Sequence, residues 1–340
     1  MELKIRHDWL NQVQEEAIDP DRPIVDPHHH FFDLVQGFPS YDLEDFKSDF
    51  STHRVEQTVF AQCGEHYRED GPEEMAPVGE TEWVDGLARQ TQQWPSGTVR
   101  VGGIVGTASL SMGSGVREVL EAHVQASDLF RGIRDSACWD ADPEPSLHSV
   151  PHANGPDLYA SAAFREGLSQ LAPLGLSFDA YHYHTQTQYF IDLARAFPDT
   201  TMILDHLGTP VGVGGYAGKR DEIFEVWKRD HTELASCENV VMKLGGLVMP
   251  WNGFGFERAP NPPTSDEIVA LQARYYHHAI EAFGPDRCMF ESNFPVDKLS
   301  VSYGVLWNAF KKIAAQYSED EKESLFRATA MRVYRLSPVD

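Results

Sequence analysis

Eight short apolar segments alternate with segments of helical pattern along this chain, and no other feature restricts its fold as strongly. The apolar segments are of strand length, and each begins about 25 to 45 residues after the one before. They are the pair Ile24 and Val25 and residues 56–62, 99–105, 129–134, 176–183, 201–204, 239–244 and 287–290. Strands that alternate with helices form parallel sheets, and eight of them favour a closed (β/α)8 TIM barrel, an α/β fold. An open dinucleotide-binding sheet is disfavoured because no GxGxxG sequence follows the first segment.

The 340 residues are predicted to form one domain behind a short N-terminal extension. TIM barrels commonly reach this length as single units, and no internal repeat or low-complexity linker divides the chain. We expect an extension at residues 1–22, a single barrel domain at 23–340, and helices that close the C-terminal end. Thr264 with Glu267, and Ser318 with Glu321, have the spacing of capping boxes, which predicts where two of the last helices begin.

Charge and cysteine content restrict the partners and the compartment. The formal net charge of −24 argues against nucleic acid and against an anionic membrane surface as partners. We expect neither a transmembrane span nor a signal peptide, because no apolar run is long enough and the N-terminus is charged. The 4 cysteines lack CxxC spacing, which favours reduced thiols in a cytoplasmic protein. The expected partner is a small molecule, and the sequence is compatible with a homo-oligomer.

Three consecutive histidines follow the first apolar segment, in the order Asp26, Pro27, His28, His29, His30. Side chains alternate between faces in an extended backbone, so His28 and His30 point one way and His29 points the other. Two imidazoles on one face at a strand end can bind one divalent metal or one substrate. Asp26 is in phase with them and can orient one ring. A surface histidine run is the alternative, but the flanking apolar residues disfavour it.

Polar side chains also stand at the ends of later apolar segments, where a barrel gathers its active-site residues. These side chains are Arg134, His182, His206, Lys243, Glu291 and Asn293. His206 could instead be a core histidine, and His182 could belong to a surface cluster with His184. For His206 and His182, a structural role therefore remains an alternative to a functional one.

Arg134 and Lys243 are the cations of this set. Arg134 can fork onto a substrate carboxylate or a lactone carbonyl, or it can pair with a carboxylate of the barrel. Lys243 could hold a metal as a carbamate or bind a substrate carboxylate, although an ion pair within the fold is favoured. Two long loops, residues 63–79 and 137–156, are expected to hang over the barrel mouth, with Trp139 the best candidate for a substrate contact.

The motifs around these residues occur in the order found in one known group of proteins. D-P-H-H-H-F-F-D-L, R-G-I-R, L-S-F-D, L-D-H-L-G-T-P, K-L-G-G-L and M-F-E-S-N-F-P-V extend from about Pro23 to Leu336. As an ordered set they resemble the amidohydrolase-related TIM-barrel hydrolases, of the amidohydrolase 2 type. Within that family they are similar to the branch of sugar-lactone and 2-pyrone-4,6-dicarboxylate lactonases. The resemblance implies that His28 and His30 are the first-strand metal pair, His206 is the sixth-strand histidine, and Arg134 binds substrate.

The chain departs from the family at the end of the eighth strand. That strand usually ends in Ser-Asp-Trp-Pro, whose aspartate deprotonates the attacking water, whereas residues 292–295 read Ser-Asn-Phe-Pro. The amide of Asn293 does not titrate in a useful range and cannot act as a general base. Glu291 is in phase with Asn293, and related lactonases tend to have a small residue there. We therefore expect Glu291 to be the base, with Asp297 as the weaker candidate.

Taken together, these features predict a hydrolase that opens a lactone, or a related cyclic ester or amide, of a small molecule. Water attacks the ring carbonyl, which His28, His30 and His206 polarise directly or through a divalent ion. We expect zinc or manganese to bind weakly or not at all, because Asn293 offers an amide as fourth ligand. The alternatives are a metal-assisted lyase such as a decarboxylase, and a catalytically silent small-molecule binding protein.

Overall fold

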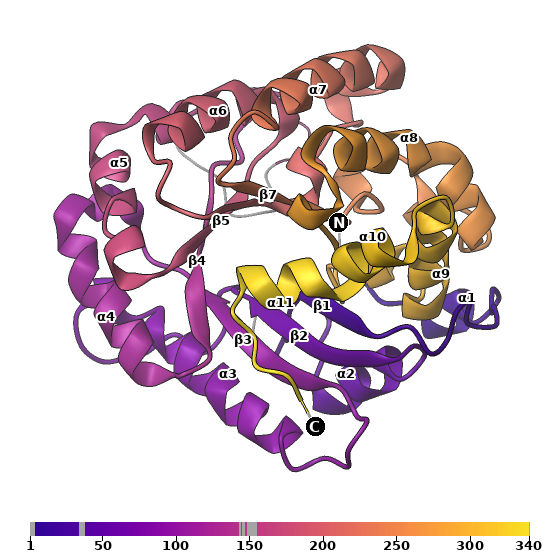
Figure 1. Cartoon of the computed structure of the whole chain (residues 1–340), viewed down its shortest axis with the longest axis horizontal. Helices are drawn as coiled ribbons and strands as arrows, with labels where there is room; N and C mark the ends of the chain where they lie inside the picture. The colour runs from indigo at the N-terminus through magenta and orange to yellow at the C-terminus, as the bar shows by residue number, and fades with distance from the viewer. Residues whose placement is uncertain (1–3, 34–37, 143, 145–146, 148–154, 340) are drawn as a thin grey trace.

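The computed structural model describes residues 4–33, 38–142, 144, 147 and 155–339. Within these residues, eight parallel strands follow one another around one sheet in chain order (Figure 1). The strands are β1 (Ile24–His29), β2 (Val55–Ala61), β3 (Arg100–Gly106), β4 (Phe130–Ser136), β5 (Ser177–Tyr181), β6 (Met202–Leu204), β7 (Val240–Leu244) and β8 (Cys288–Phe290). Most residues of these strands are buried, as expected for parallel strands that are covered on both faces.

The barrel closes between the segment that follows β8 and the end of β1. His29 and Phe294 form an isolated parallel bridge. The His30 N–H donates to the Phe294 carbonyl at 2.7 Å, and the Asn293 N–H donates to the His28 carbonyl at 3.0 Å. These bonds lie at the histidine run itself, so closure of the barrel also fixes the backbone of the candidate site. The predicted (β/α)8 TIM barrel is confirmed.

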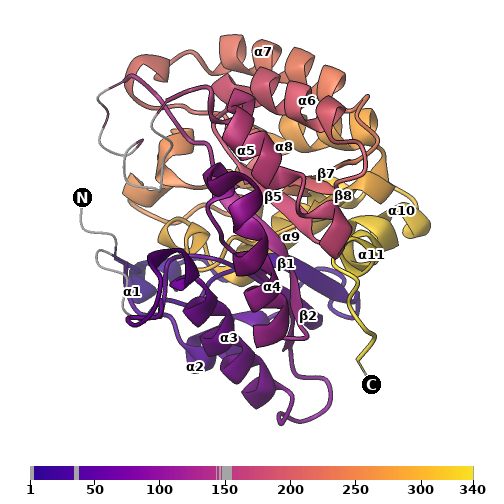
Figure 2. The same ribbon diagram turned by 90° about the vertical axis from the view of Figure 1, so that its left-hand side faces the viewer.

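Helices surround the strands and connect them in sequence, and Figure 2 shows α3 to α7 along the outside of the barrel. The helices are α1 (His7–Leu10), α2 (Leu43–Phe50), α3 (Val78–Thr91), α4 (Val116–Ala126), α5 (Ala162–Leu168), α6 (Thr187–Ala196), α7 (Arg220–Leu234), α8 (Ser265–Phe283), α9 (Tyr303–Ala314), α10 (Glu319–Glu323) and α11 (Thr329–Val333). Both predicted capping boxes are confirmed, at Thr264 before α8 and at Ser318 before α10.

The C-terminal helix seals the N-terminal end of the barrel. Figure 1 shows α10 and α11 lying across this end in front of the strands. A buried apolar cluster joins strand residues to α11 and its following turn: Val25, Val59, Val105, Ile203, Val241, Met289, Ala330, Val333, Tyr334 and Leu336. A barrel packed and covered in this way leaves only its opposite, C-terminal end for a site.

The N-terminal segment packs on the outside of the barrel. Ile5, Trp9 and Leu10 belong to the main apolar core, which also contains residues of α8 and α9. The Glu15 carboxylate accepts hydrogen bonds from the Ser265 N–H at 2.8 Å and from its hydroxyl at 2.6 Å. The described part of the predicted extension is therefore anchored at the beginning of α8.

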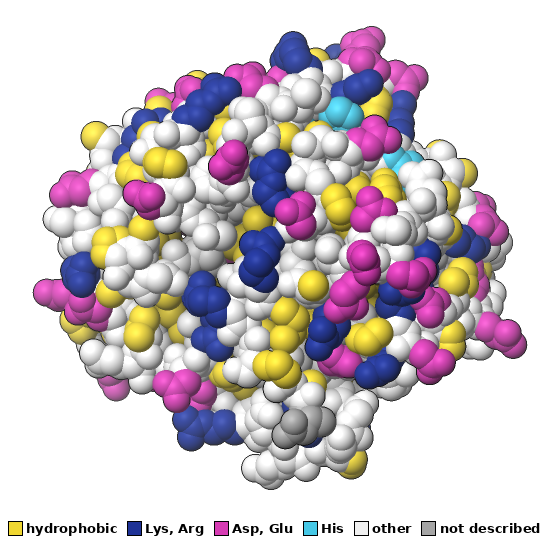
Figure 3. Space-filling view, in the orientation of Figure 1, with side chains coloured by type: hydrophobic (Ala, Val, Ile, Leu, Met, Phe, Trp, Pro, Cys, Tyr) yellow, Lys and Arg dark blue, Asp and Glu magenta, His cyan; other side chains and the backbone are white. Residues whose placement is uncertain are grey.

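The surface carries mixed charge. On the face in Figure 3, acidic side chains are interspersed with Lys and Arg. In the part of the chain that the structure describes, no helix has the length and apolar character needed to cross a bilayer. All four cysteines are free.

Candidate active site

The first strand places His28 and His30 at one buried point, as their alternation predicts. Their Nε2 atoms lie 3.2 Å apart. The His30 Nδ1–H donates to the Ala61 carbonyl at 2.8 Å, which leaves the His30 Nε2 lone pair facing His28. His29 points the other way, to Thr58 at 2.9 Å and to the phenyl rings of the core. The middle histidine is therefore structural.

His206 is held by an unusual turn directly after β6. His206, Leu207 and Thr209 have φ angles of 56°, 54° and 41°, in the left-handed region that L-residues rarely adopt. This turn directs the imidazole toward His28, at a ring-centroid distance of 4.5 Å. Gly246, after β7, passes so close that a Cβ there would lie 2.5 Å from His206 Nδ1. Only glycine fits beneath this ring, and backbone strain of this kind concentrates at functional sites.

Glu291 lies between two of the histidines. Its Oε1 accepts hydrogen bonds from the His206 N–H at 3.0 Å and from His206 Nδ1 at 2.7 Å, while its Oε2 lies 2.9 Å from His28 Nδ1. Burial alone would raise the pKa of the Glu291 carboxyl, but His206 and His28 outweigh burial and hold this pKa below its usual value. Glu291 is thus an ionised carboxylate that orients imidazoles.

A buried ion-pair network underlies the histidines. The Lys243 ammonium lies 2.7 Å from Asp179 and 2.9 Å from Asp205, and it also lies 3.1 Å from His28 Nδ1. Arg134 donates through Nε to Asp205 at 2.8 Å. The Tyr334 hydroxyl, after α11, donates to Asp179 at 2.5 Å. The favoured interpretation of Lys243 as an ion pair within the fold matches this geometry.

Arg134 pairs with a carboxylate of the barrel, one of the two roles predicted for it, and it also lies beside the histidines. Its Nη2 lies 3.3 Å from His206 Nε2, and its guanidinium stacks on Tyr181 at 4.6 Å from the ring centroid. Burial is the largest influence and would lower the Arg134 pKa, but Asp205, Tyr181 and other acidic groups around it together outweigh burial, so the pKa is raised and the group stays charged. A guanidinium beside the histidines is available to an anionic or carbonyl oxygen while Asp205 fixes its orientation.

Asn293 is turned toward a second carboxyl. Its amide Nδ2 donates to Asp297 Oδ1 at 2.9 Å, and its φ is 54°. Asp297 is fully buried, and this burial raises its pKa well above the usual value. The other Asp297 oxygen has no hydrogen-bond partner among the described residues. Asn293 and Asp297 therefore act as one unit beside β1.

His182 and Trp139 are the other two side chains predicted to bind substrate. His182 follows the end of β5, which stops earlier than predicted, and its ring packs on Phe190 and Tyr159 outside the barrel interior. Burial lowers the His182 pKa to about 3, so the ring is neutral. Trp139 is half-buried, and its carbonyl accepts a hydrogen bond from Gln186 at 2.8 Å.

Apolar side chains from several loops cover the mouth. They form one buried cluster of Cys138, Leu147, Tyr181, Tyr183, Val211, Met249 and Trp251. Tyr181 joins this cluster to the site, because its ring centroid lies 5.2 Å from that of His206. The predicted loop at 63–79 lies at the same end, where Glu65 accepts from the Asp33 N–H at 2.9 Å. Part of the loop at 137–156 falls outside the described residues, and two of its described residues, Cys138 and Leu147, belong to the cluster.

The sequence reading missed Asp179, Asp205 and Tyr334. Asp205 directly precedes His206 at a strand end, and Asp179 is the last residue of the quoted L-S-F-D motif, so both had a usable signal. Tyr334 had none, because only the packing of α11 brings it beneath the barrel. These residues decide how the cations of the site are held.

The residues present fit a divalent cation. His28, His206 and Glu291 each offer one ligand atom, and these atoms all lie within 4.8 Å of one another. This group contains two of the three histidines predicted to bind metal, with Glu291 in place of His30. Two nitrogen ligands of a tetrahedral zinc ion are roughly 3.3 Å apart, which matches the 3.2 Å between His28 Nε2 and His30 Nε2. Three carboxylates also exceed the two fixed cations in this network by one charge. The donor set suits a divalent metal, but Lys243 and Arg134 leave it only one uncompensated negative charge in this network.

A family model described as amidohydrolase matches residues 25–336. This chain belongs to the amidohydrolase family. An uncharacterized protein of Sinorhizobium fredii (strain NBRC 101917 / NGR234), y4mH, is 34% identical over 337 residues, covering 93% of this amidohydrolase and 99% of the relative. L-fucono-1,5-lactonase of Burkholderia multivorans (strain ATCC 17616 / 249) is 33% identical over 141 residues, covering 41% of this chain and 45% of the lactonase.

Solved structures share the barrel. An amidohydrolase from Burkholderia multivorans with bound zinc has a TM-score of 0.71 at 21% identity, covering 93% of this chain and 100% of that one. A putative 2-pyrone-4,6-dicarboxylic acid hydrolase from Pseudomonas putida has a TM-score of 0.58 at 15% identity, covering 96% and 100%. A manganese complex of 5-carboxyvanillate decarboxylase from Novosphingobium aromaticivorans has a TM-score of 0.56 at 12% identity, covering 94% and 97%. At these identities the likeness establishes the fold, and with the lactonase relative it confirms the resemblance.

Proposed function

We propose that this amidohydrolase opens a lactone, or a related cyclic ester or amide, of a small carboxylated molecule by attack of water. The observation that carries the proposal is the convergence of His28, His30 and His206 with Arg134 at one buried point in the C-terminal end of the barrel. The similarity to L-fucono-1,5-lactonase over part of the chain supports a lactone as substrate class.

We further propose that zinc or manganese, when bound, is held weakly by His28 and His30, with His206 as the third ligand. Such an ion supplies Lewis-acid polarisation of the ring carbonyl and a more acidic water. The ion competes with two resident cations, because Lys243 lies 3.1 Å from His28 Nδ1 and Arg134 lies 3.3 Å from His206 Nε2. This competition is the physical reason for weak binding.

His206 is the residue best placed to take a proton from water. Its Nδ1 faces Glu291 at 2.7 Å, so the proton on Nδ1 is fixed there and the Nε2 lone pair faces the site, where Arg134 Nη2 lies 3.3 Å away. An ionised carboxylate on Nδ1 also stabilises the imidazolium that forms when Nε2 accepts a proton. We expected Glu291 to be the base. In this proposal His206 is the base, and Glu291 orients its ring and stabilises its protonated form. Proton acceptance and metal binding use the same His206 atom and are alternative roles.

Arg134 and Lys243 provide the positive charge for an anionic substrate. The Arg134 guanidinium is oriented by Asp205 and Tyr181, so its remaining N–H groups can bind the carbonyl oxygen or a carboxylate without rearrangement. Lys243 is enclosed by Asp179 and Asp205, and it stabilises the network rather than contacting substrate.

A catalytically silent binding protein is the second candidate, and Asn293 is the observation that favours it. Its amide replaces a titrating carboxylate and donates to Asp297 at 2.9 Å. A turnover screen against sugar lactones and pyrone carboxylates, run beside thermal-shift binding of the same compounds, separates the two functions. We expect hydrolysis, seen as acid release. Binding without turnover of any bound compound would establish the silent protein, and decarboxylation without ring opening would establish a lyase.

A further inference from the structure

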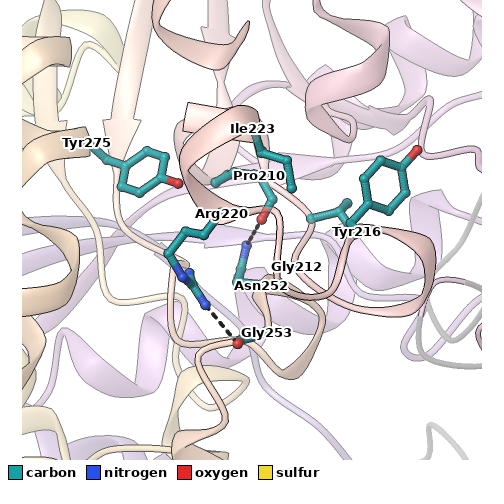
Figure 4. Close-up of a pocket in the computed structure, with 10 residues that line it drawn as sticks. Pro210, Gly212, Tyr216, Arg220, Ile223, Asn252, Gly253 and Tyr275 are labelled. Atoms are coloured by element: carbon teal, nitrogen blue, oxygen red, sulfur yellow. Dashed lines mark hydrogen bonds between the residues drawn. The ribbon is translucent and has the colours of Figure 1, made fainter. Parts of the chain in front are cut away.

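A cavity lies between the loops that follow β6 and β7 and the helices α7 and α8 (Figure 4). Its volume is about 110 Å³, whereas one water needs only roughly 10–15 Å³ of the same kind of space, so a small organic molecule fits. The lining residues are Pro210, Val211, Gly212, Tyr216, Gly218, Arg220, Ile223, Asn252, Gly253 and Tyr275. None of the active-site residues lines it.

Arg220 is the only charged residue in this lining. Its Nη2 donates to the Gly253 carbonyl at 2.8 Å, and its guanidinium stacks on Phe254 at 3.7 Å from the ring centroid, as Figure 4 shows for the first contact. Within the described part of the chain no carboxylate forms a salt bridge with Arg220, whereas neighbouring Arg274 pairs with Asp221 at 2.7 Å. A half-buried arginine without a counter-ion, in a protein of net charge −24, is a site for an anion.

Asn252 is a second, independent indication that this cavity binds a ligand. Its side chain is 1% exposed, and its Nδ2 donates to the Pro210 carbonyl at 3.0 Å. Its Oδ1 has no hydrogen-bond partner among the described residues, although a buried acceptor of this kind is usually satisfied. The Arg220 guanidinium can therefore bind an oxyanion, and the Asn252 Oδ1 can accept a hydrogen bond from a hydroxyl or amino group.

We propose that this cavity binds a small hydroxycarboxylate, with the carboxylate on Arg220 and the hydroxyl donating to Asn252 Oδ1. The tyrosine rings of Tyr216 and Tyr275 and the side chain of Ile223 bound the carbon skeleton. Lactone hydrolysis yields compounds of this class, so the match to a reaction product rests on the proposed function. The site itself rests only on the cavity and its side chains.

The cavity is joined to the cover of the active site. The Gly212 N–H donates to the Trp251 carbonyl at 2.9 Å, and the Val211 N–H donates to His184 Nδ1 at 3.3 Å. Val211 and Trp251 both belong to the apolar cluster over the mouth. A ligand that bridges Arg220 and Asn252 holds these two loops together.

The test is calorimetric titration of the full-length protein with glycolate, with acetate and ethylene glycol as probes of the separate groups. We expect saturable glycolate binding, weaker acetate binding and no measurable ethylene glycol binding. Arg220→Gln should weaken glycolate binding at least about tenfold, since hydrogen bonds to a charged group are lost. Arg229→Gln is the matched control on the same helix, because Arg229 is exposed and pairs with Asp230.

Two further variants locate the binding. Ile223→Phe narrows the cavity while leaving Arg220 in place, so it should also weaken glycolate binding. This variant replaces Arg220→Gln as the test if Arg220→Gln does not fold. Arg134→Gln removes the guanidinium of the active site and should leave this binding unchanged. Glycolate binding that Arg134→Gln abolishes, or that Arg220→Gln and Ile223→Phe leave intact, would overturn the proposal. None of these readouts requires turnover, so failure of the lactonase function would be seen separately.

Discussion

At the scale of single residues, Glu291 decides how the histidines work. Glu291→Gln keeps the shape of the side chain but removes the charge that fixes the His206 Nδ1 proton at 2.7 Å. We predict that turnover falls at least about a hundredfold, the usual contribution of general acid–base catalysis. The measurement is kcat on the best lactone from the screen, with circular dichroism to confirm the fold.

Asn293→Ala is the comparison for Glu291→Gln. The Asn293 amide does not titrate, so we expect Asn293→Ala mainly to weaken substrate binding and raise KM. Asp297→Asn tests the remaining carboxyl of the pair. Near-normal turnover in Glu291→Gln together with inactive Asp297→Asn would assign proton transfer to Asp297 instead.

The histidines were predictable from the sequence because strand alternation fixes which side chains share a face. His28 and His30 needed only that rule, and His206 needed only its place after an apolar strand. His182 obeyed the same rule up to the strand end, but β5 stops at Tyr181 and the side chain turns away from the interior. The partners of Lys243 depend on contacts among strands far apart in sequence, which no local pattern contains.

At the scale of elements, strands and helices were predictable but the turns were not. The β6 turn contains His206, Leu207 and Thr209 with positive φ, a conformation that their residue types disfavour. Tertiary contacts stabilise it, including the His206 N–H donating to Glu291. Local propensity could not have predicted a left-handed turn that depends on a glutamate from another strand.

At this scale, Glu80 in the first turn of α3 binds the backbone of the loop that follows β2. Its Oε1 accepts from the N–H groups of Cys63, Gly64 and Glu65, at 3.0, 2.8 and 2.8 Å. Burial is the largest influence and raises the Glu80 pKa from 4.5 to about 7. The folded state therefore keeps a proton that the unfolded state releases between these pH values.

The sign of the pH effect follows directly. Because the folded-state pKa of Glu80 is raised, its stabilising contribution is complete below pH 4.5 and is lost as the pH rises to about 7. Glu80→Gln is neutral throughout, so we predict that the wild type loses about 3 kcal/mol relative to this variant across the interval. Urea unfolding of both proteins from pH 4.5 to 7.5 measures the difference. Parallel stability curves would contradict the assignment.

At the scale of the whole molecule, charge balance determines metal affinity. The residues offer two facing Nε2 atoms 3.2 Å apart, but Lys243 and Arg134 bring two cations to the same place. We predict substoichiometric zinc or manganese, removable by dialysis against a chelator, and a further loss in His30→Gln. Mass spectrometry of metals in protein purified without a His tag checks this. A stoichiometric ion that resists the chelator would contradict it.

The whole molecule also includes the segment before β1, which the sequence suggested was an extension. The Trp9 indole N–H lies 3.1 and 3.0 Å from the carbonyls of Ala259 and Pro260, and the side chain is 8% exposed. Removing a buried tryptophan typically costs 3–5 kcal/mol, roughly. We therefore predict that Trp9→Ala lowers Tm by about 5 °C or more in a thermal scan.

Asp8→Ala, on the exposed side of the same short helix, is the control for Trp9→Ala and should leave Tm within about 1 °C, as surface substitutions usually do. A large effect of Trp9 with none of Asp8 would show that residues 4–22 are part of the folded unit. Equal, small effects would show that this segment is a dispensable extension. The first outcome is expected because Ile5, Trp9 and Leu10 share one apolar core with α8 and α9. The packing of these three side chains therefore contributes to the free energy of unfolding of the barrel.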